Sequence, residues 1–221
     1  MKKYVILISL GVVLILAAVT GVLLFKGKAD PKETASEALQ KLNAAQSFRY
    51  TFVQHEINGA QEKLLADLSG EKSGNDIGLK GKVAGNDVEM VCLGDDFFNR
   101  DLLNQKWVRY PGIAGTVIQQ LFPVEFNPST IVELDETDEV VLHNEEVINE
   151  KKCWVYQITP KVAADSINKE WKNFAATLYV DKSSHNVVRT VLTADHQRKE
   201  RKLRLTLDYD SIGAEITLNK P

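Results

Sequence analysis

From Phe48 onward, apolar and polar residues alternate along most of the chain, in short runs separated by turns rich in glycine and asparagine. A period of two places alternate side chains on opposite faces of a β-strand. In the run 202–210, for example, Leu203, Leu205 and Tyr209 share one face, while Arg204 and Asp208 share the other. Short consecutive strands with tight connections pair as an antiparallel meander. This alternation therefore predicts a mainly antiparallel sheet with one apolar face.

The turn signals divide the alternating region into separate strands. We expect strands at 49–57, 61–72, 76–83, 87–94, 95–101, 106–111, 138–148, 151–160, 174–182, 186–196 and 202–211, with a last segment at 214–221 that closes the chain. Glycines recur through the first six runs, and glycine in a strand permits bulges and sharp bends. The predicted fold class is α+β, mainly antiparallel β, with one strongly curved sheet of about ten strands covered by short helices.

The predicted sheet needs other segments to cover its concave face. A helix is expected over 31–46, because Asp30 can cap it, Pro31 suits its first position and Glu33 suits a capping box. A second helix is expected over 113–122, where Pro123 stops it. The stretch 162–174 is expected to be a short helix or crossover with Trp171 turned inward. These helices are short, so we expect them to cover the opening without filling the cavity.

The N-terminal residues 4–25 form an uncharged apolar run. As a helix rising about 1.5 Å per residue, such a run can cross a bilayer. A cleaved signal peptide, a lipoprotein signal and a buried core helix are the alternatives. The run is too long for the first, no cysteine follows it for the second, and it has no polar face for the third. We expect one transmembrane signal anchor in 1–28, a single domain in 29–221 outside the cytoplasmic membrane, and thus a single-pass protein of the cell membrane.

Residues that could carry chemistry are scattered. The net charge of −3 makes nucleic acid an unexpected partner. The four histidines lack metal-ligand spacing, and Ser183, Ser184 and His185 are adjacent in an expected turn, which rarely builds a nucleophile with its base. The acidic run 133–139 lacks the spacing of a calcium loop and is expected to be a solvated connection. We therefore predict no enzyme activity, no catalytic residue, no metal and no cofactor.

Two further features leave alternatives open. The basic run 196–202 is expected to be a charged hairpin tip, and the alternative is contact with anionic headgroups through Arg198, Lys199, Arg201 and Lys202. Cys92 and Cys153 lie in separate expected strands, and either a disulfide or two buried thiols would suit a domain outside the cytoplasm.

Three motifs carry a resemblance to a known family. They are GDDFFNRDLLNQKW at 94–107, LYVDKSSHNVVRTVL at 178–192 and the tail LDYDSIGAEITLNKP at 207–221. Together with the N-terminal helix and the glycine-punctuated meander, they resemble the lipoprotein-carrier and LppX-type lipid-binding superfamily across nearly all of 31–221. The chain departs from the lipoprotein members because it has an expected transmembrane helix in place of an acylated cysteine.

The resemblance implies a half-barrel that holds an apolar cavity under a helical lid and binds acyl chains of lipids or lipoproteins. The expected function is a non-catalytic, membrane-anchored binder for envelope lipid or lipoprotein transport. A sensor or interaction ectodomain without permanent cargo, contacting an envelope protein, is the alternative, and an enzyme with an unrecognised site is a third. The residues expected to line the cavity are Phe52, Leu79, Phe98, Trp107, Leu121, Leu178 and Leu205. Phe97 and Phe98 are adjacent, so at most one of them can face that cavity.

Overall fold

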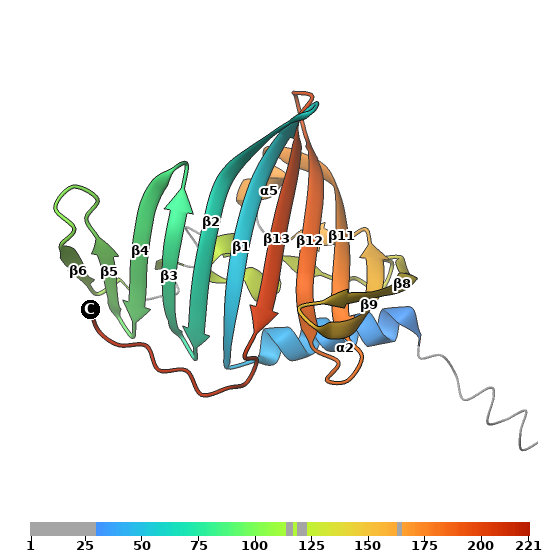
Figure 1. Ribbon diagram of the computed structural model, residues 1–221, viewed down its shortest axis with the longest axis horizontal. Helices are drawn as coiled ribbons and strands as arrows, with labels where there is room; N and C mark the ends of the chain where they lie inside the picture. The colour runs from blue at the N-terminus through green and yellow to red at the C-terminus, as the bar shows by residue number, and fades with distance from the viewer. Residues whose placement is uncertain (1–29, 114–116, 119–122, 163–164) are drawn as a thin grey trace, which may run out of the picture.

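Eleven antiparallel strands form one curved, open sheet (Figure 1). The computed structural model describes residues 30–113, 117–118, 123–162 and 165–221. Across the sheet the strand order is β6-β5-β4-β3-β2-β1-β13-β12-β11-β9-β8, and a small second sheet pairs β10 with β7. The prediction of a mainly antiparallel, strongly curved sheet is therefore confirmed.

The first half of the chain contributes α2 (Pro31–Ala44), β1 (Ser47–Asn58), β2 (Gln61–Ser73), β3 (Asp76–Val83), β4 (Asn86–Leu93), β5 (Asp96–Arg100) and β6 (Trp107–Pro111). The second half contributes α4 (Pro123–Phe126), the 3-10 turn η1 (Pro128–Thr130), β7 (Val132–Glu133), β8 (Val140–Ile148), β9 (Lys151–Ile158), β10 (Lys161–Val162), α5 (Asp165–Asn168), β11 (Trp171–Asp181), β12 (Val187–His196) and β13 (Lys202–Asp210). The eleven long strands match the expected runs to within a few residues.

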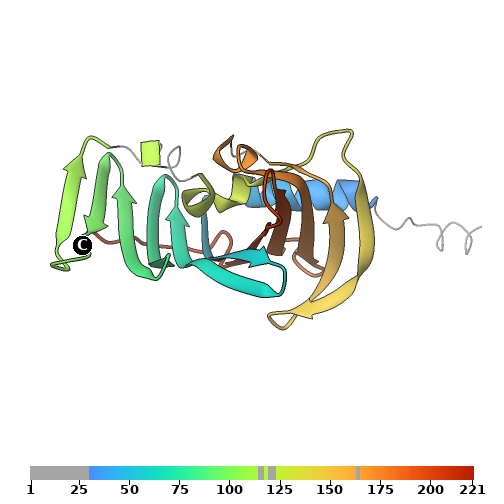
Figure 2. The same cartoon turned by 90° about the horizontal axis from the view of Figure 1, so that it is seen from above.

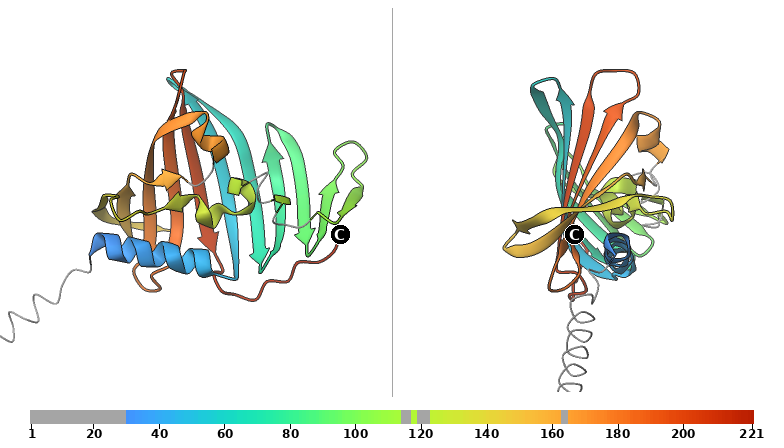
Figure 3. Two further views of the ribbon diagram at one scale, coloured as in Figure 1. Left: turned by 180° about the vertical axis from the view of Figure 1, so that it is seen from behind. Right: turned by 90° about the vertical axis from the view of Figure 1, so that its right-hand side faces the viewer.

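The strand β1 pairs with β13 in the middle of the sheet, with Arg49 opposite Asp210 and Ile57 opposite Lys202. This seam joins a half made of β1–β6 to a half made of β8, β9 and β11–β13. The described helices α2, α4 and α5 lie on one face of the sheet, the concave one (Figures 2 and 3). The fold therefore has a sheet layer and a thinner, discontinuous layer that covers only part of it.

The helix α2 begins where the sequence predicts. The carboxylate of Asp30 accepts a hydrogen bond from the backbone N–H of Lys32 at 2.9 Å, and Pro31 occupies the first turn. Four apolar side chains on one stripe of α2 are buried against the sheet: Ala35, Ala38, Leu39 and Leu42. Because two of them are alanines, the helix can lie close to the strands.

The segment from α4 to β7 fills the middle of the concave face. Phe126, Ile131 and Val132 are buried in the same core as the strand side chains. Two tyrosines of the sheet hold this segment down, because Tyr50 donates its hydroxyl to the carbonyl of Glu125 and Tyr209 donates to the carbonyl of Pro128. The two prolines that bracket this stretch open α4 and η1.

The tail after β13 forms no strand. Residues 214–221, the expected last segment, cross the outer, convex face of β1–β5 along one end of the strands (Figure 1). Ser47 and Ser73 donate their hydroxyls to the carbonyls of Ala214 and Ile216 at 2.6 and 2.8 Å. The tail runs across the strands, so it cannot add to the ladder of the sheet.

The stretch 162–174 contains the end of β10, the short helix α5 and the start of β11. Trp171 is buried there, as expected. The expected anchor at residues 4–25 lies outside the described residues, and so does most of the expected helix at 113–122. Among the residues that are described, no helix has the length and apolar character needed to span a bilayer.

Cys92 and Cys153 are two free, buried thiols. They lie on β4 and β9, which are separated by the six strands β3, β2, β1, β13, β12 and β11. Neighbouring strands are about 4.8 Å apart, and a disulfide needs Cα atoms within about 7 Å. The structure therefore favours the buried-thiol alternative over the disulfide.

Candidate functional site

The wall of the candidate site is the concave face of β3 to β6. Register places Leu79, Met90, Asn99 and Val108 opposite one another in one row across these strands. The next row contains Ile77, Cys92, Phe97 and Tyr110. Side chains of both rows point to the same face because each row is two residues from the other along every strand. The alternation of the sequence therefore produces a continuous apolar wall.

An apolar hollow of about 430 Å³ lies against this wall. It is lined by Met90, Phe97, Asn99, Tyr110, Gly112, Ile113, Val117 and Ile118. Ile118 is buried, whereas Tyr110 and Val117 are 41% and 45% exposed. The hollow is thus closed on the side of the core and open at the side of the edge strand β6.

The chain itself forms the roof of the hollow by turning back after β6. Pro111 ends the strand, and Gly112 follows with a φ of +76°, a conformation that glycine adopts without steric cost. This turn brings Ile113, Val117 and Ile118 over the wall. The rings of Phe97 and Tyr110 pack together with centroids 5.8 Å apart and form the floor near the edge.

The hollow has little polarity. Among the described residues that line it, none is charged, and the only polar side chains are the amide of Asn99 and the hydroxyl of Tyr110. Lys72 lies in the same row as Ile77, with its Nζ 5.7 Å from the centre of the Phe48 ring, and burial lowers its pKa. Burial also raises the pKa of Glu125, on the segment that fills the middle of the concave face. The described lining of the hollow is therefore suited to an apolar ligand.

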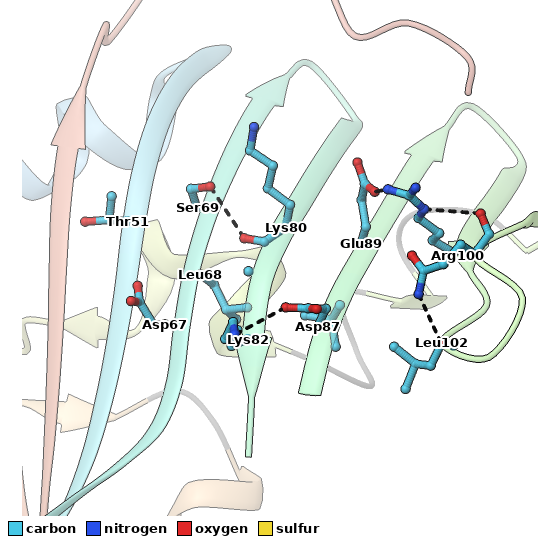
Figure 4. Close-up of a pocket in the computed structure, with 13 residues that line it drawn as sticks. Thr51, Asp67, Leu68, Ser69, Lys80, Lys82, Asp87, Glu89, Arg100 and Leu102 are labelled. Atoms are coloured by element: carbon cyan, nitrogen blue, oxygen red, sulfur yellow. Dashed lines mark hydrogen bonds and ion pairs between the residues drawn. The ribbon is translucent and has the colours of Figure 1, made fainter. Parts of the chain in front are cut away.

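A second hollow, of about 570 Å³, lies on the outer face over β2 to β5 (Figure 4). Charged side chains of both signs line it and pair with each other. Nη1 of Arg100 is 2.7 Å from Oε2 of Glu89, and Nζ of Lys82 is 3.7 Å from Oδ1 of Asp87. This surface is a groove of exposed ion pairs, which contribute little to stability and give a ligand no net charge to recognise. We therefore take the apolar hollow as the candidate site.

Three of the residues expected to line a cavity lie in solid core instead. Phe52, Leu178 and Leu205 are at most 1% exposed and belong to the same buried core as the apolar side chains of α2 and of the segment 126–132. The expectation that helices cover the opening without filling it is therefore wrong for this half of the sheet. Leu79 is also buried; it lies directly opposite Met90 on the neighbouring strand but does not itself line the hollow.

Two other expected residues lie on the outer face. Phe98 faces away from Phe97, and the tail covers it, with Nζ of Lys220 5.6 Å from the ring centre. Trp107 shares that outer face, because it lies two residues from Arg109, the partner of Phe98. Leu121 lies outside the described residues. The alternation places Phe97 and Phe98 on opposite faces of the sheet. In the structure Phe97 lines the hollow on the concave face, and Phe98 lies under the tail on the outer face.

The polar motifs do not form a site. The carboxylate of Asp181 accepts hydrogen bonds from the hydroxyls of Ser183 and Ser184, and the His185 ring packs on Trp154 at 5.4 Å. Burial alone would raise the pKa of Asp181, but the hydrogen bonds from Ser184 and Ser183 outweigh burial and lower it. These residues are a hydrogen-bonded turn, as expected, and no triad is assembled.

The acidic and basic runs are also accounted for by local contacts. Lys32 donates to the backbone carbonyls of Glu136 and Asp138, which fixes the acidic run beside α2. In the basic run, Arg201 pairs with Glu56 at 2.9 Å, while Lys202 lies 4.0 Å from Asp195. Within the described part of the chain, no three His, Cys, Asp or Glu side chains come together as a metal site.

Two solved structures have the same fold. The lipoprotein LppX of Mycobacterium tuberculosis is similar to this chain with a TM-score of 0.54 and 12% identity, over 86% of this chain and 98% of its own. LprF from Mycobacterium bovis is similar with a TM-score of 0.57 and 11% identity, over 86% and 96%. No protein-family model matches the sequence, and no curated protein matches it significantly. The resemblance predicted from the motifs is therefore confirmed at the level of the fold.

Proposed function

We propose that this chain is a non-catalytic protein that binds an acyl chain of a lipid or lipoprotein in the apolar hollow between β4, β6 and Ile118. The observation that carries this proposal is the hollow itself, whose volume of about 430 Å³ is bounded by aliphatic and aromatic side chains. Ligand pockets in proteins are typically about 300–1,000 Å³ and mostly apolar. Affinity would come from burying methylene groups, at about 0.8 kcal/mol each.

The anchoring and transport role belong to the same proposal. The uncharged run at 4–25 supports a single transmembrane helix, with the domain 29–221 outside the cytoplasmic membrane. The shared fold with LppX and LprF supports a role in the cell envelope. In this arrangement the tethered domain would receive or hand over an acyl chain near the membrane.

Photocrosslinking in cells tests the binding site. Cells that express the full chain are fed a fatty acid carrying a diazirine, and crosslinked peptides of the purified protein are mapped by mass spectrometry. We expect crosslinks on the peptides that contain Met90, Phe97 and Tyr110. Met90→Trp should remove most of them, because the larger ring occupies the hollow.

Val91→Trp is the matched control. Val91 is the next residue on β4, is equally half-buried, and faces the opposite side of the sheet. It should leave the crosslinks unchanged. Crosslinks confined to residues 4–25, or equal loss in both variants, would show that the hollow does not hold the acyl chain.

A second candidate function is a sensor or interaction ectodomain without permanent cargo. The filled core between β1 and β11 favours it, because Phe52, Leu178 and Leu205 are buried there in one continuous apolar cluster. Native mass spectrometry of the full chain, released from membranes, separates the two functions. Co-purifying lipid of one mass class supports the binder, and an empty protein supports the ectodomain.

A further inference from the structure

The tip of the β5–β6 hairpin, residues 101–106, exposes two leucines to solvent. Leu103 is 96% exposed and Leu102 is 52% exposed, and Leu103 is the most exposed large hydrophobic side chain in the described part of the protein. Single exposed leucines are ordinary on protein surfaces. A pair at the very end of a hairpin is a more specific feature, because no neighbouring strand can shield it.

The turn that carries these leucines is held by its own hydrogen bonds. The carboxylate of Asp101 accepts from the backbone N–H groups of Leu103 and Asn104 at 2.9 and 3.0 Å. Oδ1 of Asn104 accepts from the N–H of Lys106 at 2.8 Å, and the N–H of Asp101 donates to the carbonyl of Lys106 at 2.8 Å. Several backbone donors of the tip are therefore satisfied within the tip itself. Such a turn can leave water at a low cost in lost hydrogen bonds.

An exposed apolar path leads from the tip to the hollow. Val108 and Tyr110 follow the tip along β6, two residues apart and on the concave face, and they are 37% and 41% exposed. Tyr110 lines the hollow. A surface that accepts the tip would thus lie beside the open side of the hollow.

We propose that the hairpin tip docks on a lipid bilayer, with Leu102 and Leu103 inserted at the boundary between headgroups and acyl chains. Two leucines are too small for a protein partner, because a stable interface buries about 800 Å² on each side. They suit a membrane, where one or two apolar side chains insert and an adjacent cation remains among the headgroups. Lys106 provides that cation at the base of the turn. The docking proposal is argued only from the hairpin tip. The transfer of an acyl chain from the bilayer into the hollow rests on the proposed function.

The tip lies at the end of the strands away from α2. The N–H of Gly74 donates to the carbonyl of Gln46, so the β2–β3 turn and the end of α2 share one end of the sheet, and β5 runs from that end to the tip (Figure 1). The β1–β2 hairpin turn, with the exposed and uncharged Ala60, lies at the same end of the sheet as the β5–β6 tip (Figure 1). It provides a matched position for a control.

An environment-sensitive dye tests the docking in the full chain. Both native cysteines are buried, so a cysteine introduced by Leu103→Cys is labelled selectively in the folded protein. The labelled protein is reconstituted in vesicles of neutral and anionic phospholipid, with and without brominated acyl chains. We expect a blue shift of the dye emission and quenching by the brominated lipid. The control, Ala60→Cys with the same dye, should show neither.

Two results would overturn the proposal. The first is equal quenching at residues 103 and 60, which would mean that the leucine tip has no special access to the bilayer. The second is a blue shift at residue 103 that rises with protein concentration and not with lipid, which would assign the tip to a second copy of the chain. Crosslinking of the diazirine acid to Met90 is measured separately, so loss of docking and loss of acyl binding are distinguishable.

Discussion

The packing of Tyr50 on Gly70 makes a sharp prediction about stability. A Cβ atom added at Gly70 would lie 2.0 Å from Cζ of Tyr50 and 2.3 Å from its hydroxyl oxygen. The Tyr50 ring is 3% exposed, and its hydroxyl donates to the carbonyl of Glu125. Gly70→Ala must therefore displace a buried ring from the core and break its hydrogen bond to the segment that fills the concave face.

The cost follows from these two losses. Overpacking a core costs about 1–3 kcal/mol, and leaving a buried acceptor without its donor costs about 1–3 kcal/mol. Moving the Tyr50 ring relieves the overpacking but breaks its hydrogen bond to Glu125, so the two costs are not fully additive. We expect Gly70→Ala to lower the free energy of unfolding by about 2–4 kcal/mol. Without the ring, alanine in a strand should be more stable than glycine by about 0.5–1 kcal/mol.

Urea unfolding of four proteins tests this reasoning. They are the parent chain, Gly70→Ala, Tyr50→Ala and the double variant, each followed by circular dichroism. The Gly70→Ala change should destabilise the parent and be neutral or stabilising in the Tyr50→Ala background. An equal loss in both backgrounds would refute the proposed contact, because the cost would then come from the backbone of β2.

Two further predictions concern ionisable groups. Burial raises the pKa of Cys92 to about 11 and also raises the pKa of Cys153. Neither thiol should therefore react with a disulfide reagent in the folded protein, and both should react in urea. Fast reaction without denaturant would contradict the burial of the two thiols. Burial also raises the pKa of Glu125, so the folded state binds its proton more tightly than the unfolded state, and its contribution to stability falls as pH rises above about 4.5. Glu125→Gln should therefore become more stable relative to the parent between pH 4 and pH 7 in urea titrations, and a constant difference would contradict the shift.

The strands and α2 could be predicted because their signals are local. Alternation, turn residues and the Asp30 cap each act within a few residues, and the structure confirms them. The β1–β13 seam had no local signal, since it joins residues from the two ends of the domain. Pairing of this kind depends on the whole sheet and not on either strand.

The candidate site was harder to predict. The sequence shows that Phe97 and Phe98 point to opposite faces of the sheet. It does not show that the concave face carries the hollow beside Phe97, or that the tail covers Phe98 on the outer face. The path of the tail over Phe98 had no signal in the sequence, and it buries this second ring on the outer face of the sheet. The filling of the core by Phe126 and Val132 was also missed, because a short irregular segment has no period that reveals its apolar face.

The seam between β1 and β13 has a consequence for how the domain is made. A ribosome delivers β1 to β6 long before β13 exists, so the first half must wait with an open edge along β1. The hairpins β1–β6 can form early, because their contacts are local, whereas closure across the sheet is a late event with high contact order. Folding of this protein should therefore be limited by the arrival of its last strand, and an unpaired β1 is the place where a chaperone or a second nascent chain would compete for it.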